Sequence, residues 1–251
     1  MQVTRIATLV AVATLLVACA PEPTASALAA KSIANLKTAR TVHLDGGGSL
    51  AINAQQGISF SLDFKVAGDA ELPDKARMTL NITTFGRSFS FETITIGGKV
   101  YTKDATSGRW SEGTGSAPIN SVMDPLGNID ASSIHDVVEV DRPEVDGKKT
   151  RHLRYAADTT RMLADMKKAA GTSAQSFSNP QGTGEIWIRI DDAQIVRQLV
   201  KVTLDVDGLA GLDLGPGAAG VGKASIEMSL DMRFSHHGEA VPQVTAPPLG
   251  R

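Results

Sequence analysis

Apolar and polar side chains alternate with a period of two through several segments of this chain, and this pattern limits the folds it can adopt. The alternation is unbroken over residues 58–66 and recurs over residues 78–82, 186–190, 200–206 and 226–234. Successive side chains of a β-strand point to opposite faces of a sheet, so each segment is expected to be a strand with one apolar face. The chain is therefore predicted to form a sheet with one apolar side.

Turn signals between these segments predict that sequence neighbours pair in an antiparallel meander. They are Pro73-Asp74, Gly97-Gly98, residues 107–110, Asp146-Gly147 and Asp191-Asp192. Asp-Gly is a strong hairpin signal because both residues tolerate the positive φ angles of a tight turn. We expect seven to ten strands.

Two features predict irregular strands. Three glycines at residues 46–48 interrupt the first strand, which is expected to resume at Leu50. The apolar positions shift from odd to even numbers between Phe91 and Ile94, which predicts a β-bulge near Glu92-Thr93.

The remaining segments are predicted to be loops or helices. Residues 172–182 are expected to form a polar loop, residues 208–222 a mobile glycine-rich hairpin loop, and residues 236–251 an extended or disordered tail. One helix is predicted over residues 24–39, capped by Thr24 or Ser26, with others over residues 159–170 and near residue 130.

Few helices are available to cover the apolar side of such a sheet. The fold class predicted is thus α+β: a curled antiparallel sheet, covered by a few helices, with part of its inner face left as an apolar cavity for a ligand. In the alternative, helices and bulky side chains fill the interior completely, and alternation does not distinguish the two.

The only cysteine, Cys19, ends a short leader. Arg5 precedes an apolar run over residues 6–17, and residues 16–19 read L-V-A-C, the lipobox of a bacterial lipoprotein signal. The alternative is a transmembrane anchor, but the run is shorter than the ~20 residues that a spanning helix needs. We expect cleavage before Cys19 and acylation of its sulfur, for example with palmitate, which would hold the protein on the outer face of the cell membrane.

These features divide the chain into four parts. They are a signal peptide over residues 1–18, a lipidated tether over residues 19–27, a single domain over residues 28–235 and a flexible tail over residues 236–251.

Composition and motifs argue against several functions. The formal net charge is −2, without a basic field for nucleic acid. Residues 215–220 fit G-x-G-x-x-G and residues 217–223 fit G-x-x-x-x-G-K, but Ala224 replaces the hydroxyl that would ligate Mg²⁺ and a strand follows in place of a helix.

Catalytic and metal sites are not predicted either. No G-x-S-x-G elbow frames a serine, and Asp191-Asp192 is interpreted as a turn. No histidine has a partner four residues away on a helix; the five are His43, His135, His152, His236 and His237. We expect no enzyme activity, no metal and no cofactor.

Residues 27–234 resemble the mycobacterial lipoprotein family of LppX, LprA, LprF and LprG. The resemblance depends most on residues 97–103 (G-G-K-V-Y-T-K), Gly108-Arg109-Trp110 and residues 184–206. It implies a half-barrel similar to the LolA and LolB lipoprotein carriers, with an apolar cavity for the acyl chains of glycolipids or phospholipids. It also implies lipid transport across the mycobacterial cell envelope and a major-facilitator-type transporter as a partner.

The expected function is therefore a monomeric, membrane-anchored lipid carrier. An adaptor lipoprotein that partners an envelope transporter is the alternative, and an envelope enzyme is a third hypothesis without sequence support. The candidate cavity-lining residues come from the alternating apolar sets of the strands: Phe60, Leu62, Phe64, Leu80, Ile82, Ile188, Val202, Leu204, Met228 and Leu230.

Overall fold

The computed structural model describes residues 21–54, 59–84, 86–114, 131–160, 176–207 and 222–249. Cys19, the helix predicted over residues 159–170 beyond Thr160, and all but the last residue of the loop predicted over residues 208–222 lie outside these ranges. The described elements are the helix α2 (Ala25–Thr38), the 3-10 turn η1 (Ala131–Ser133), and the strands β1 (Thr41–Ala54), β2 (Ser59–Glu71), β3 (Lys75–Thr84), β4 (Arg87–Ile96), β5 (Lys99–Lys103), β6 (Trp110–Thr114), β7 (Ile134–Asp141), β8 (Glu144–Val145), β9 (Lys148–Ala157), β10 (Ser176–Arg189), β11 (Ile195–Asp207) and β12 (Lys223–Ser235).

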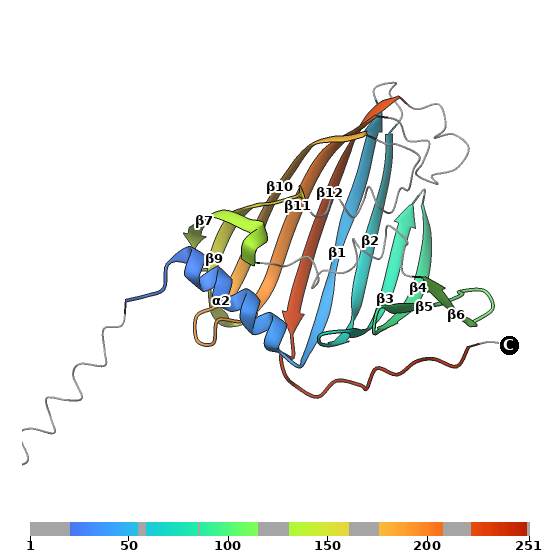
Figure 1. Cartoon of the computed structure of the whole chain (residues 1–251), viewed down its shortest axis with the longest axis horizontal. Coiled ribbons are helices and arrows are strands. Elements are labelled where there is room, and N and C mark those ends of the chain that lie inside the picture. Colours follow the sequence, from blue (N-terminus) through green and yellow to red (C-terminus); the bar gives the residue numbers. More distant parts are fainter. Residues whose placement is uncertain are drawn as a thin grey trace, which may run out of the picture.

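The strands form one antiparallel sheet of twelve, more than the seven to ten expected (Figure 1). Its order is β6-β5-β4-β3-β2-β1-β12-β11-β10-β9-β7, with β8 paired to β9. Each half of the sheet is built largely from neighbours in sequence, as the turn signals predicted. The pairing of β1 with β12 joins the two halves.

Two predicted hairpin turns have the backbone that their sequences favour. Gly97 and Gly98 have φ angles of 56° and 79°, and Asp146 and Gly147 have φ angles of 50° and 74°. Positive φ at both central residues matches the right-handed twist of the flanking strands. These turns connect β4 to β5 and β8 to β9.

The glycine triplet does not interrupt the first strand, contrary to the prediction. β1 continues through residues 46–48 and stays in register with β2 and β12. A Cβ atom on Gly46 would lie 2.7 Å from Met232 Sδ, and one on Gly48 would lie 2.6 Å from Phe64 Cζ. The glycines therefore leave room for large side chains from the adjoining strands.

The bulge predicted near Glu92-Thr93 is absent, because β4 pairs with β3 and β5 without a register shift. The shift of apolar positions instead marks a change of face. Phe91 packs toward the side of the sheet that contacts α2, whereas Ile94 lies on the opposite side in a small cluster with Tyr101 and Val244. A second apolar surface, absent from our expectation, explains the pattern.

Residues 236–249 cover that second surface. The tail, expected to be extended or disordered, is extended along the sheet, and Val244 is buried. The Val244 N–H donates a hydrogen bond to Glu71 Oε1 at 2.6 Å, and the Gly238 N–H donates to the Thr41 carbonyl at 2.9 Å. The tail is thus fastened near its start and at its middle.

The loop predicted over residues 172–182 is wrong from Ser176 onward, because β10 starts there. Asn179, which has a φ of 51°, lies within a register shift of the β10–β11 pair, and a second shift lies between Trp187 and Ile188. The polar residues and the proline of this segment predicted a loop, because regular strand pairing disfavours them. Bulges let β10 accommodate these residues within a strand.

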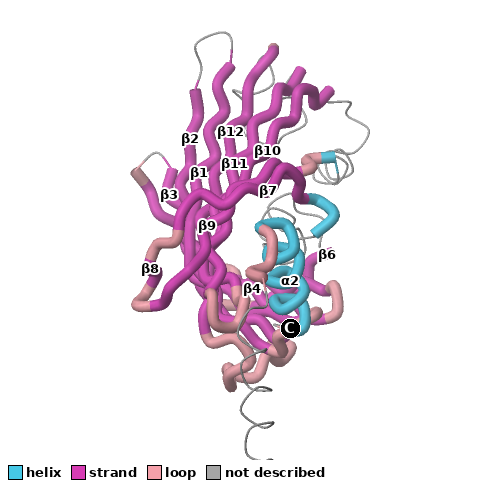
Figure 2. Tube along the Cα trace, turned by 90° about the vertical axis from the view of Figure 1, so that its left-hand side faces the viewer, coloured by secondary structure: helices cyan, strands magenta, loops and turns pink. Residues whose placement is uncertain are grey.

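The helix α2 lies against one end of the long strands (Figures 1 and 2). Thr24 caps it as predicted, and Thr24 Oγ1 accepts a hydrogen bond from the Ala27 N–H at 3.3 Å. Asn35 Nδ2 donates to the Asp192 carbonyl in the turn between β10 and β11 at 3.1 Å. None of the helices in the described ranges is long and apolar enough to cross a membrane.

Candidate functional site

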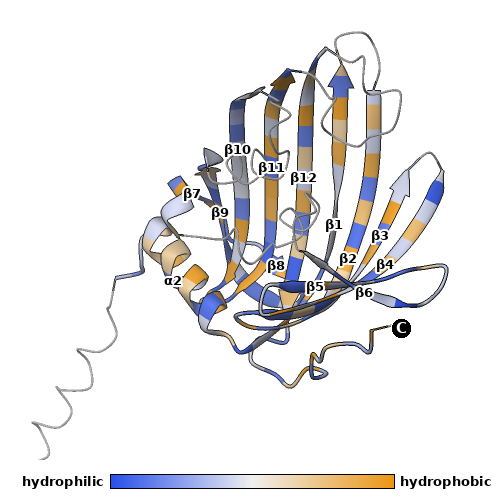
Figure 3. Ribbon diagram, turned by 45° about the vertical axis from the view of Figure 1, so that its right-hand side comes forward, coloured by the Kyte–Doolittle hydropathy of each residue, from blue (hydrophilic) through white to orange (hydrophobic). Residues whose placement is uncertain are grey.

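All ten residues predicted to line a cavity lie on one face of the sheet, which we call the inner face; the other is the outer face. The pairing register sets Leu50 of β1 opposite Leu62 and Met228, and Met228 opposite Val202. Even-numbered side chains of β1, β2, β3, β11 and β12 therefore share this face. Banded hydropathy along these strands reflects the same alternation (Figure 3).

Buried apolar side chains on the inner face form two separate clusters. The helix-side cluster joins Leu28, Ile33 and Leu36 of α2 to strand residues that include Leu44 and Ile188. The strand-end cluster lies nearer the other ends of the long strands and contains no residue of α2. Its buried members are Ile52, Val202, Leu204, Val206, Ala224 and Ile226.

The two clusters divide the ten predicted residues. Four are buried in the helix-side cluster and two pack against it: Phe64, Leu80, Ile188 and Leu230, with Leu62 and Ile82 at its margin. Two are buried in the strand-end cluster and two pack against it: Val202 and Leu204, with Phe60 and Met228 at its margin. Ile188 is fully buried, so it belongs to the packed core.

Several members of the strand-end cluster, notably Ile52, Val206 and Ile226, are not among the ten predicted cavity-lining residues. The signal was available, because Ile52 lies in phase with Leu50, and Val206 and Ile226 lie in the same alternating runs as Val202 and Met228. Half-buried Leu50 and Val200 also pack against this cluster. Phe89, opposite Ile82 on the inner face, is 46% exposed.

A buried polar pair lies at the helix-side cluster, of which Tyr155 is a member. Gln198 Nε2 donates a hydrogen bond to Tyr155 Oη at 3.0 Å, and burial raises the pKa of the Tyr155 hydroxyl. The Tyr155 ring occupies the space over Gly184, where a Cβ atom would overlap Tyr155 Cζ. Gly184 pairs with Val200, at the margin of the strand-end cluster. Glycine at this position is therefore a packing requirement.

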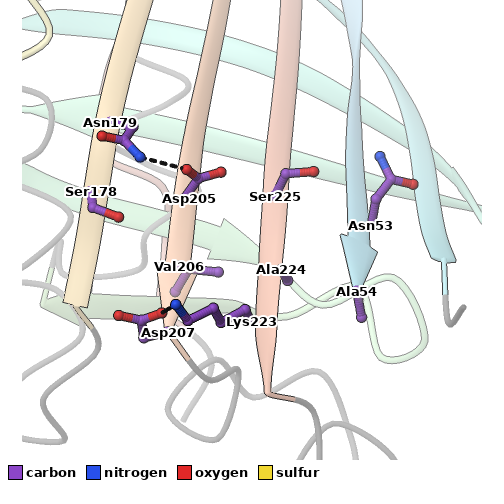
Figure 4. A pocket seen from close by; sticks show the side chains of 10 residues that line it. All are labelled: Asn53, Ala54, Ser178, Asn179, Asp205, Val206, Asp207, Lys223, Ala224 and Ser225. Carbon is purple, nitrogen blue, oxygen red and sulfur yellow. Dashed lines mark hydrogen bonds and ion pairs between the residues drawn. The ribbon is translucent and has the colours of Figure 1, made fainter. Parts of the chain in front are cut away.

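A polar hollow of about 450 Å³ opens at the same ends of the strands (Figure 4). Its lining includes Asn179, which donates to Asp205 at 2.8 Å, and Lys223, whose Nζ lies 4.0 Å from Asp207. None of the ten predicted residues lines it. Val206 and Ala224 of the strand-end cluster, however, contribute to its lining.

The histidines of the outer face take part in structural contacts. His152 stacks on Trp187 with ring centroids 4.2 Å apart, and its two nitrogens lie 2.9 Å from Asp141 and from Glu185. The guanidinium of Arg197 lies over the other side of the Trp187 ring, 4.5 Å from its centroid. The tryptophan is thus enclosed between two polar side chains.

One grouping near the start of the tail contains histidine, serine and a carboxylate. His43 Nδ1 lies 2.7 Å from Asp69 Oδ1. Ser235 Oγ, in contrast, lies 3.3 Å from Nδ1 of a different histidine, His236. Neither histidine joins the serine to the carboxylate as a nucleophilic triad requires. Across the described part of the chain, no group of three or more metal-ligating side chains is close enough to hold an ion.

No protein-family model and no curated protein matches the sequence. The structure is similar to LprF from Mycobacterium bovis, with 15% identity, coverage of 92% of this chain and 100% of that one, and a TM-score of 0.48. It is also similar to the lipoprotein LppX from Mycobacterium tuberculosis, with 16% identity, 90% and 100% coverage and a TM-score of 0.46.

A more distant similarity is to a LolA superfamily protein from Nitrosomonas europaea, with 9% identity, coverage of 84% and 93%, and a TM-score of 0.33. Two members of the lipoprotein family that the sequence resembles, LprF and LppX, are thus among the solved structures similar to this chain.

Proposed function

We propose that this chain is a lipoprotein that binds acylated lipid, a glycolipid or a phospholipid, in an apolar cavity on the inner face of a curled sheet. Acylation of Cys19 would hold it on the outer face of the cell membrane, and the bound lipid would be carried across the envelope. The observation that supports this proposal is the strand-end cluster: an apolar surface on the inner face to which α2 contributes no residue.

The lengths of the elements support a cavity at that end. β11 and β12 have 13 residues each, or about 43 Å of strand. The 14 residues of α2 span only about 21 Å. The helix can therefore cover at most about half the length of these strands, and a ligand with acyl chains would lie against the half-buried margin of the strand-end cluster, which includes Leu50, Val200 and Met228.

The chemistry of the surface suits acyl chains. Each methylene taken from water into an apolar site is worth ~0.8 kcal/mol, so exposing a 16-carbon chain to water costs on the order of 13 kcal/mol. Exchange between a bilayer and an apolar cavity avoids this cost and stays reversible. Met228 at the cluster margin is flexible enough to adapt to chains of different lengths.

Lipid extraction tests the proposal directly. Protein purified from its native host should release acylated lipid that native mass spectrometry detects as a mass difference. In Met228→Glu, a charge placed at the margin of the strand-end cluster should abolish most of this bound lipid, because a buried carboxylate opposes apolar ligands.

The matched control is Ser229→Glu, the next residue of β12 on the outer face, opposite Lys201. It should retain lipid. Absence of lipid from the native-host protein, or equal retention by both variants, would contradict the proposal. A stable transporter complex formed by lipid-free protein would favour the adaptor function instead.

A further inference from the structure

The first described residues of the chain are fastened to one edge of the sheet by two arginines. Glu22 Oε2 accepts a hydrogen bond from Arg142 Nη2 at 2.6 Å, and Glu22 Oε1 accepts one from Nη1 at 3.2 Å. The Pro23 carbonyl accepts one from Arg151 Nη1 at 2.9 Å. Both arginines also pair with Glu139 of β7. We call these five residues the tether clamp.

The tether clamp is part of the fold, because one of its arginines is buried. The Arg151 side chain is 7% exposed, and a buried guanidinium needs acceptors for its donors. Hydrogen bonds from Arg151, and then from Arg142, hold the pKa of Glu139 below its usual range. The Pro23 carbonyl is one of the acceptors of Arg151, so the segment beside it completes the site.

The clamp lies very close in sequence to the proposed lipid anchor. Cys19 precedes Glu22 by three residues, which span at most about 11 Å of chain. If the sulfur of Cys19 bears acyl chains in a bilayer, Glu22 must lie near the bilayer surface. The edge of the sheet that holds Glu22 then lies there too.

This edge of the sheet suits contact with lipid head groups. β7 is the terminal strand of the sheet in the described part of the chain, and its side chains Val138 and Val140 are 45% and 48% exposed. Val138 is opposite Arg154, whose exposed guanidinium can approach phosphate groups. Exposed apolar side chains beside a cation such as Arg154 are typical of surfaces that lie in the membrane interface.

We propose that strand β7, with Val138 and Val140, lies on the surface of the membrane that holds the acyl group of Cys19. The inference deepens the proposed function, since it rests on the proposed anchor. It places β4–β6 away from the membrane, because these strands lie at the other end of the sheet from β7 (Figure 1). β4 is eight strand spacings from β7, or about 38 Å along the sheet.

Fluorescence quenching in vesicles tests this orientation. Full-length lipidated protein is reconstituted into phosphatidylcholine–phosphatidylglycerol vesicles that contain head-group spin-labelled lipid. Val140→Cys or Ser88→Cys, the latter on β4, supplies the only free thiol for a fluorophore, because the Cys19 sulfur is acylated. The label at position 140 should lose most of its fluorescence, and the label at position 88 should retain it.

Two further variants test the tether clamp. Arg142→Gln removes the ion pair with Glu22 and should reduce the contrast between the two labels. Arg233→Gln removes an exposed ion pair, with Asp146, that involves neither the tether nor β7, and it should preserve that contrast.

The outcomes separate the orientation from the anchor. Equal quenching at both positions in protein that floats with the vesicles, or a contrast that Arg142→Gln leaves intact, would overturn the orientation alone. Wild-type protein that floats no better than Cys19→Ala would overturn the anchor, and with it this proposal.

Discussion

The helix-side and strand-end clusters share the inner face of one sheet but differ in what packs on them. Leu44 and Leu50 illustrate the difference within β1: both point to the inner face, yet Leu44 is fully buried beside α2, whereas Leu50 is half-buried at the margin of the strand-end cluster. Identical alternation thus produces two environments. We infer that the first stabilises the fold and the second serves the ligand.

Truncating each of these leucines gives the largest expected effect and the most direct test of the comparison. Leu44→Ala should lower the free energy of unfolding by ~2–5 kcal/mol, because it opens a cavity in a packed core. Leu50→Ala should lower it less and should weaken lipid binding, which Leu44→Ala leaves unchanged. Urea unfolding and lipid titration measure the two quantities. Equal losses of stability would remove the distinction between the clusters.

The boundary between the clusters gives the second prediction. Gly184→Ala should lower the free energy of unfolding by about 1–3 kcal/mol, because its Cβ overlaps the Tyr155 ring. Gly113→Ala is the control: this glycine also lies in a strand, but its Cβ would be 3.8 Å from the nearest atom, the Val100 carbonyl oxygen. Thermal unfolding compares the two variants. A similar effect of both would mean that strand propensity, and not the ring, sets the requirement for glycine.

The tail on the outer face gives the prediction with the smallest expected effect, which concerns the contact between Glu71 and Val244. Hydrogen bonds from the Val244 N–H, and then from Lys75, hold the pKa of Glu71 below its usual value. A carboxylate with a lowered pKa contributes stability above the unfolded pKa of ~4.3 and loses it as the pH falls through the folded pKa. Because Glu71 is partly exposed, this contribution should be under about 1 kcal/mol.

The amide chemical shift of Val244 reports this step. It should change as the pH is lowered below ~4.3 in the wild type and should stay constant over that window in Glu71→Gln. Glu144→Gln, on the exposed β8, should retain the step. A pH-independent Val244 signal in the wild type would contradict the role of Glu71.

Local patterns predicted much of this architecture. Alternation identified the strand that contains Phe60, Leu62 and Phe64, and glycine or Asp-Gly signals identified its turns, because these depend on neighbours in sequence. The same patterns identified the ten inner-face residues. They could not assign Phe64 to one cluster and Val202 to the other, because that depends on which strands α2 contacts.

Two of the wrong predictions, the bulge in β4 and the break in β1, share a cause: each depended on a distant partner. The position of Ile94 suggested a bulge, but Ile94 packs on a second apolar surface with Val244, a residue far along the chain. The glycines at residues 46–48 suggested a break, but they accommodate side chains such as Met232 of β12. The contacts of Arg151 with Pro23 also connect distant segments, which left the tether clamp without a local signal.

The seam between β1 and β12 has a consequence for how the chain acquires its fold. Leu44 pairs with Phe234, 190 positions later. One edge of β1 therefore has no hydrogen-bonding partner until β12, the last strand, has been synthesised. Non-local pairing slows folding, and an unpaired apolar strand is prone to aggregation meanwhile. During synthesis and export, β1 must therefore be shielded until nearly the whole chain has emerged, and a chain truncated before β12 would expose the edges of both halves.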